Sequence, residues 1–129
     1  MSGERGSVTV VTAAVIAVLV VITMGAADVG HALVARAHAE QAADAAALAA
    51  AQELAFSTGR EPAAVAAEYA ERNGGTLTAC VCAAGDTGAL VDVSVPVGSL
   101  LLLPGDRLVT ARARAVVDLP ALPRAATAP

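Results

Sequence analysis

Two cysteines, Cys80 and Cys82, are the side chains of this sequence best suited to covalent chemistry. They stand two residues apart in a segment with a strand-like pattern, so both would point to one face with α-carbons about 6.6 Å apart. That distance is near the outer limit for a disulfide. Three interpretations stay open: a local structural disulfide in an oxidising compartment, free or intermolecularly paired thiols, and a redox-active or metal-binding pair.

The rest of the sequence offers no arrangement typical of catalysis or of cofactor binding. His31 and His38 are seven residues apart, which would place them on one helical face about 10 Å apart, too far to hold one metal ion. The sequence contains no phosphate-binding loop, nucleophile elbow or zinc motif. We therefore expect a protein that is not an enzyme and that uses no cofactor, metal or small-molecule substrate.

Two further features indicate contacts rather than chemistry. Asp28 ends a long apolar run, and it either marks the water boundary of a membrane or pairs with the helix of another subunit. Four leucines, Leu100, Leu101, Leu102 and Leu103, stand together in a connector and must be buried somewhere. They either close one end of a small sheet against the preceding helix or contact a partner or a membrane.

The composition narrows the class of protein. Hydrophobic residues make up 57% of the 129 residues, above the 45–50% that is usual in soluble domains, and much of the excess is alanine. Its core must therefore depend on close backbone approach and many small contacts. The net charge is −4 and there is no lysine, which argues against nucleic-acid binding.

An uncharged apolar segment covers residues 8–27 and predicts a transmembrane helix. Twenty helical residues rise about 30 Å, which matches the hydrocarbon core of a bilayer. Residues 1–7 would form a short cytoplasmic leader, since Arg5 and the amino group precede the span and the positive-inside bias favours that orientation. We expect a single-pass plasma-membrane protein whose C-terminal domain is extracytoplasmic.

The same segment also permits a second interpretation. Gly25, Ala26 and Ala27 are small residues at a plausible signal-cleavage position. Cleavage near Ala27 would release a small secreted binding or effector protein, which is the alternative function that the sequence leaves open.

The remaining elements give an α+β fold. Residues 28–56 are rich in alanine and predict a stalk helix that continues the span and either covers a sheet or bundles with other helices. Residues 61–118 predict a small domain with a second helix over 62–73 and a three-stranded antiparallel sheet. The strands are expected over 76–83, 89–97 and 107–118, and residues 119–129 are expected to form a disordered tail.

Two strings in the N-terminal half carry a resemblance to a known family. The string ERGSVTV at residues 4–10, which leads into the apolar helix, resembles the start of TadE/TadG-like proteins of tight-adherence (Flp-type) pilus and secretion systems. The string QAADAAALA at residues 41–49 is similar to the signature that follows the membrane helix in that group. The closest likeness is to the short actinobacterial TadE-like subgroup encoded near helicase and secretion genes.

The resemblance implies a structural role. It implies a pilin-like plan and a minor pilin-like or assembly component that contacts other pilus or secretion-system membrane proteins through the stalk helix. A prepilin-type leader would end at Gly6 and leave Ser7 as the first residue. That pattern has glutamate at the fifth position after the cleaved bond, whereas this sequence has Val11 there.

Overall fold

The computed structural model describes residues 4–103 and 105–118, and its architecture confirms the predicted α+β class. Its elements in chain order are α1 (Glu4–Ala55), α2 (Pro62–Arg72), β1 (Thr76–Val81), β2 (Gly88–Val97) and β3 (Arg107–Val116). Residues 1–3 of the predicted leader, Pro104 and the predicted tail at 119–129 lie outside the described residues.

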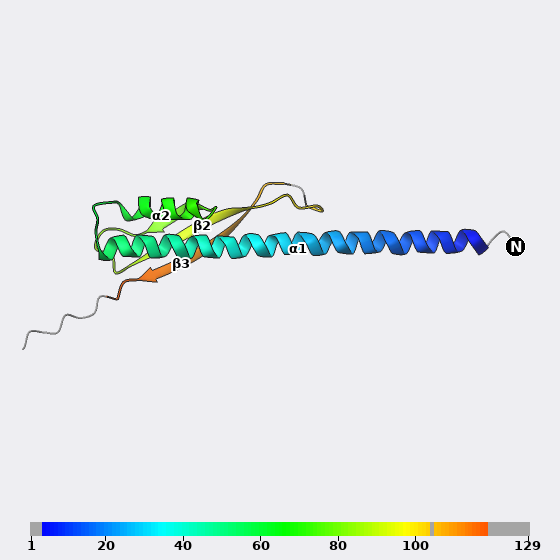
Figure 1. Ribbon diagram of the computed structural model, residues 1–129, viewed down its shortest axis with the longest axis horizontal. Coiled ribbons are helices and arrows are strands. Elements are labelled where there is room, and N and C mark those ends of the chain that lie inside the picture. Colours follow the sequence, from blue (N-terminus) through cyan, green and yellow to red (C-terminus); the bar gives the residue numbers. More distant parts are fainter. Residues whose placement is uncertain (1–3, 104, 119–129) are drawn as a thin grey trace, which may run out of the picture.

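The longest element, α1, is one continuous helix of 52 residues, about 78 Å in length. It is long and apolar enough to cross a membrane, and the apolar window that qualifies contains no buried residue. Thr12 and Thr23 donate their hydroxyl hydrogens to the carbonyls four residues earlier, so their polar groups are satisfied within the helix. Figure 1 shows that the N-terminal part of α1 projects as a straight rod well beyond the rest of the fold.

The three strands form an antiparallel sheet in the order β1-β2-β3, as the sequence predicts. The pairing of β2 with β3 is regular throughout, and it places Val91 opposite Ala113 and Val93 opposite Ala111. The pairing of β1 with β2 shifts between Leu77 and Ala79. Such a shift is a β-bulge, which increases the local twist of the strand.

One face of the sheet is covered by helix. The C-terminal part of α1 packs across β2 and β3, and α2 packs beside α1 and over β1 (Figure 1). Val91 and Val93 of β2 are fully buried beneath α1. The α1 side of this core consists of alanines that are almost wholly buried: Ala39, Ala42, Ala43, Ala46, Ala47, Ala50 and Ala51. These small side chains let the helix axis approach the sheet closely, which confirms the small-contact core that the composition predicts.

A tight glycine turn joins α2 to the sheet. The N–H of Gly75 donates to the carbonyl of Ala70, and the N–H of Gly74 donates to that of Glu71. These two bonds form a Schellman motif, in which Gly74 adopts a φ of 74° that side chains disfavour. A Cβ atom on Gly75 would lie only 2.5 Å from a methyl group of Val93. The turn therefore needs glycine at both positions: Gly74 for its backbone conformation, and Gly75 because there is no space for a side chain.

The first strand ends at Val81, two residues before its predicted end. After it, the N–H of Ala83 donates to the carboxylate of Asp86, and the N–H of Asp86 donates to the carbonyl of Ala83. This side-chain turn takes the backbone groups that a longer strand would have used for pairing.

Candidate interaction surfaces

The described residues contain no cluster suited to metal-dependent catalysis. No group of three or more His, Cys, Asp or Glu side chains in this part of the chain could hold a metal ion. His31 and His38 are both exposed on α1, beside a shallow hollow that Val95 and Pro96 of β2 help to line.

Cys80 and Cys82 are joined by a disulfide. Their α-carbons lie 5.6 Å apart, closer than two residues of an extended strand allow, because the chain leaves β1 after Val81. Cys82 is buried against the core. The geometry matches the interpretation of a local structural disulfide, and the function of the pair stays a prediction.

Asp28 ties a distant loop to α1. Its carboxylate accepts the backbone N–H of Leu101 at 2.7 Å and that of Leu102 at 2.8 Å. Both amides belong to the connector between β2 and β3, more than seventy residues further along the chain. Asp28 is only 7% exposed, so the carboxylate that the sequence places at a water boundary or a subunit contact is occupied within the chain.

The four consecutive leucines, residues 100–103, form what we call the leucine loop. Leu100 is partly buried beside α1, whereas Leu101, Leu102 and Leu103 are 61%, 44% and 51% exposed. An open apolar cavity of about 490 Å³ lies behind the loop, between α1 and the start of β3, with Arg107 at its edge. The loop therefore only partly closes the end of the sheet, and three of its leucines are only partly covered by the described residues.

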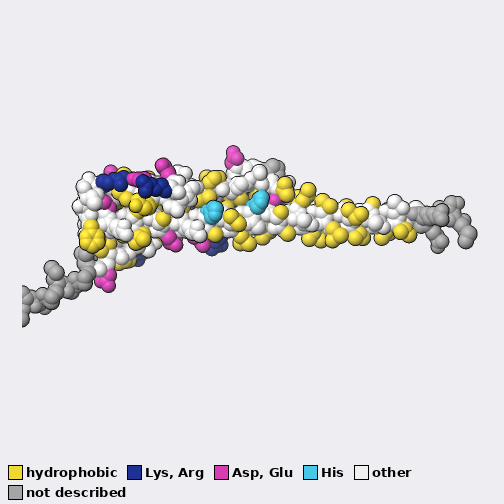
Figure 2. All heavy atoms as spheres, in the orientation of Figure 1, with side chains coloured by type: hydrophobic (Ala, Val, Ile, Leu, Met, Phe, Trp, Pro, Cys, Tyr) yellow, Lys and Arg dark blue, Asp and Glu magenta, His cyan; other side chains and the backbone are white. Residues whose placement is uncertain are grey.

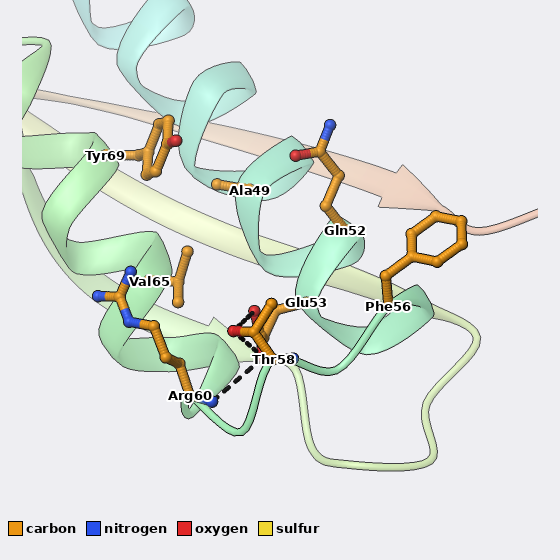
Figure 3. Close-up of a pocket in the computed structure, with 8 residues that line it drawn as sticks. All are labelled: Ala49, Gln52, Glu53, Phe56, Thr58, Arg60, Val65 and Tyr69. Atoms are coloured by element: carbon orange, nitrogen blue, oxygen red, sulfur yellow. Dashed lines mark hydrogen bonds between the residues drawn. The ribbon is translucent and has the colours of Figure 1, made fainter.

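Glu53 ties a second loop to the opposite end of the packed part of α1 (Figure 3). Its carboxylate accepts the N–H of Thr58 at 2.6 Å, the hydroxyl of Thr58, and the N–H of Arg60 at 3.2 Å. Burial acts to raise the pKa of Glu53, but these hydrogen bonds and the nearby charge of Arg60 outweigh it. The pKa therefore lies below its ordinary value of 4.5.

The same end of the molecule carries the only two aromatic side chains of the sequence, and neither is buried. Phe56 is 76% exposed, and Figure 3 shows its ring pointing away from Glu53. Tyr69 lies on α2, and the guanidinium of Arg72 lies 5.3 Å from its ring centroid. Phe56 and Tyr69 border a hollow of about 390 Å³ between the end of α1 and α2.

The uncovered face of the sheet is held by a charged pair. Arg112 donates two hydrogen bonds to the carboxylate of Asp92, at 2.6 and 2.8 Å, across the β2–β3 pairing. The hydrogen bonds and charge of Arg112 lower the pKa of Asp92 against the opposing effect of burial.

The structure thus gathers the predicted contact residues into one place and leaves others apart. Asp28 and the leucine loop meet at one end of the sheet, whereas the disulfide lies in β1 and just beyond it. Gly6 and Ser7 lie in the first turns of α1, far along the projecting rod (Figure 1). Sequence reasoning missed Glu53, although a carboxylate in the last turn of a helix opposes the helix dipole and so indicates another partner.

Residues 6–53 match the family model described as "Tad: Putative Flp pilus-assembly TadE/G-like". Most of α1 is a TadE/G-like segment. The match covers the projecting rod and most of the alanine-rich part that packs on the sheet, and it confirms the resemblance that the sequence strings indicate. Comparisons with curated proteins and with solved structures gave no match. The family is one of structural pilus-assembly components, and the narrower actinobacterial subgroup stays a prediction.

Proposed function

We propose that this TadE/G-like chain is a membrane-anchored, minor pilin-like structural component of a tight-adherence-type pilus or secretion system. Residues 8–27 of α1 would cross the plasma membrane, with the N-terminus in the cytoplasm and the sheet domain outside. The chain would act by packing against other membrane proteins of the assembly rather than by catalysis.

The observation that carries this proposal is the exposed apolar rod. Every residue of α1 from 6 to 24 is exposed, although the segment consists almost entirely of valine, isoleucine, leucine, alanine and threonine. Figure 2 shows no charged side chain along this rod on the face in view, up to the undescribed residues. A solvent-exposed apolar surface of this extent is costly in water, and a lipid bilayer removes that cost.

Two features of the domain support an extracytoplasmic location. The disulfide between Cys80 and Cys82 suits an oxidising compartment, since cytoplasmic thiols are kept reduced. Apart from Glu4 and Arg5, every charged residue of the sequence follows the apolar segment, so a translocated C-terminal part would carry nearly all of the charge.

The outward face of the alanine-rich part of α1 is the surface we assign to partner helices. Val29, Leu33, Val34 and Leu48 are each more than half exposed there, while the opposite face is buried against the sheet. Small neighbours between them allow a second helix to approach closely. The two roles that the sequence allows for this helix are therefore compatible. Its inner face covers the chain's own sheet, and its outer face would pack on neighbouring helices.

Photo-crosslinking in intact cells tests this assignment. A photoreactive residue at Leu33 or at Leu48 should capture another membrane protein of the assembly. The same residue at Thr110, which is exposed on the other face of the sheet, serves as the control and should capture less. Equal capture at the three positions, or none at Leu33 and Leu48, would contradict a partner surface on α1.

The mass of the mature N-terminus tests anchoring against secretion. A chain that begins at Met1 or Ser2 and stays in the membrane pellet supports the anchor. A chain that begins at Ser7 supports prepilin-type processing with the apolar segment retained. A chain that begins at Asp28 and is found in the medium supports the alternative of a secreted protein and overturns the proposal.

A further inference from the structure

The leucine loop lies beside the part of α1 that is proposed to enter the membrane. Figure 1 shows the connector between β2 and β3 running past the end of the sheet, alongside α1 and toward its N-terminus. Leu102 reaches Gly25, where a Cβ atom would be 3.8 Å from its terminal methyl group. Gly25 is two residues inside the apolar segment, so Leu102 lies about 3 Å inside its outer end along the helix axis.

Asp28 fixes the loop at that level. The two hydrogen bonds from Leu101 and Leu102 use both oxygens of the carboxylate, and they also satisfy two amides that would otherwise face an apolar surrounding. A buried carboxylate that accepts two backbone amides holds the loop backbone at a set height on α1. The exposed leucine side chains of the loop are then presented together, next to the helix surface.

We propose that the leucine loop enters the outer leaflet of the bilayer and forms a second membrane contact beside the α1 anchor. The proposal rests on the proposed membrane anchoring of residues 8–27. The bilayer is the occupant that the positions favour, because a hydrocarbon core that covers the apolar segment reaches the depth of Gly25 and Leu102. The contact would limit the tilt of the sheet domain relative to the membrane, which an anchor helix alone leaves less restricted.

Single tryptophans test the depth of the loop, since the natural sequence contains none. The full chain would be reconstituted into vesicles of phosphatidylcholine and phosphatidylglycerol with brominated acyl chains, which quench tryptophan emission on contact. Leu101→Trp reports on the loop at its most exposed leucine. Ile16→Trp reports on the anchor, and Phe56→Trp reports on the end of α1 farthest from it.

We expect Leu101→Trp to emit at shorter wavelength than Phe56→Trp and to be strongly quenched by shallow bromines. Ile16→Trp should be quenched most by deep bromines, and Phe56→Trp should not be quenched. If Ile16→Trp is quenched while Leu101→Trp behaves like Phe56→Trp, the loop proposal is overturned and the anchor stands. If Ile16→Trp is itself unquenched, membrane anchoring fails and the loop proposal fails with it.

Two further arms keep the test decisive. Leu102→Trp places the reporter one residue on, and quenching of either variant supports the proposal if the other fails to fold. If the emission of Leu101→Trp is blue-shifted but unquenched, and the shift depends on the protein-to-lipid ratio, a second copy of the chain covers the loop. That result overturns the proposal.

Adding Asp28→Asn to the Leu101→Trp chain exchanges one acceptor oxygen for a donor and should reduce the quenching by shallow bromines. Unchanged quenching would overturn the role of Asp28 in setting the depth.

Discussion

In residues 8–27 of α1 the large aliphatic side chains point outward on all sides, whereas in residues 28–55 most of the alanines are buried against the rest of the domain. Both parts are one uninterrupted helix. The difference lies in the size of the side chains and in what surrounds them, since no residue of the first part's apolar window is buried by the described part of the chain. The second part has a complete protein layer on one face and an open face on the other.

The comparison separates two reasons for a helix. In the first part, a bilayer would require every backbone N–H and C=O to bond within the segment, and β-branched residues are acceptable there because no other structure is available. In the second part, alanine has the highest helix propensity and also the volume that the packed interface requires. We expect the same substitution to have a large effect in one part and little effect in the other.

The largest expected effect comes from charge in the first part. Replacing Ile16 and Leu19 with arginine should cost about 2.5–3.5 kcal/mol of membrane insertion for each arginine. The variant should appear in the supernatant after an alkaline wash of the membranes, whereas the parent chain should stay in the pellet.

The matched control carries the same two changes in the second part, at Leu33 and Leu48. Both side chains are more than half exposed on the outer face of α1, so the membrane fraction should be unchanged. Equal release of both variants would show that the first part is not the anchor and would remove the basis of the comparison.

The second-largest expected effect comes from the volume of a buried side chain. Ala46 is fully buried between α1 and the sheet, so Ala46→Leu should destabilise the domain by about 1–3 kcal/mol through overpacking. Ala14→Leu makes the same change in the exposed first part and should leave the stability of the domain unchanged. Thermal unfolding of the sheet signal in detergent micelles measures both. An Ala46→Leu chain as stable as Ala14→Leu would mean that the alanine core is loosely packed.

Periodicity was sufficient to predict most of this fold. The alternation of valines in β2 and alanines in β3 predicts which residues face the helix, and Val91, Val93, Ala111 and Ala113 are indeed buried. The glycine pair after α2 likewise predicts the helix end. The early end of β1 was not predictable, because it depends on the carboxylate of Asp86 and on the disulfide of Cys82 rather than on any alternation.

The candidate surfaces were predicted less completely. The sequence marks Asp28 and the four leucines separately, since each is unusual in its own context. It does not show that they meet, because a contact across more than seventy residues depends on the way β2 and β3 pack along α1. Glu53 was missed for a similar reason, because its partners are the backbone amides of Thr58 and Arg60. Backbone amides occur at nearly every residue and leave no mark in a sequence.

Two glycines give smaller expected effects, one in the packed turn after α2 and one on an open side of α1. Gly75→Ala should destabilise the domain by about 1–3 kcal/mol, because the new methyl group would overlap Val93 and crowd Ala42. Gly30→Ala meets no atom within 4 Å and lies inside α1, so it should stabilise the helix by up to about 1 kcal/mol. Chemical unfolding of the full chain in micelles measures both. A Gly75→Ala chain as stable as the parent would show that the Gly75 turn can relax away from β2.

The smallest effect concerns the carboxylate that ends the packed part of α1. The pKa of Glu53 is lowered in the folded chain, so its contribution to stability is fully present above its ordinary value of 4.5. That contribution is lost as the pH falls through the folded pKa, because the unfolded chain then binds the proton more readily.

The melting temperature of the full chain should therefore decrease as the pH is lowered below about 4.5. The decrease should be less steep in Thr58→Val, which loses one hydrogen-bond donor to Glu53, and least steep in Glu53→Gln. Glu53→Gln should also be less stable than the parent at neutral pH, since an amide cannot accept all of these bonds with both terminal atoms. Parallel pH profiles for the three chains would contradict this, and they would mean that the turn after α1 holds its shape without Glu53.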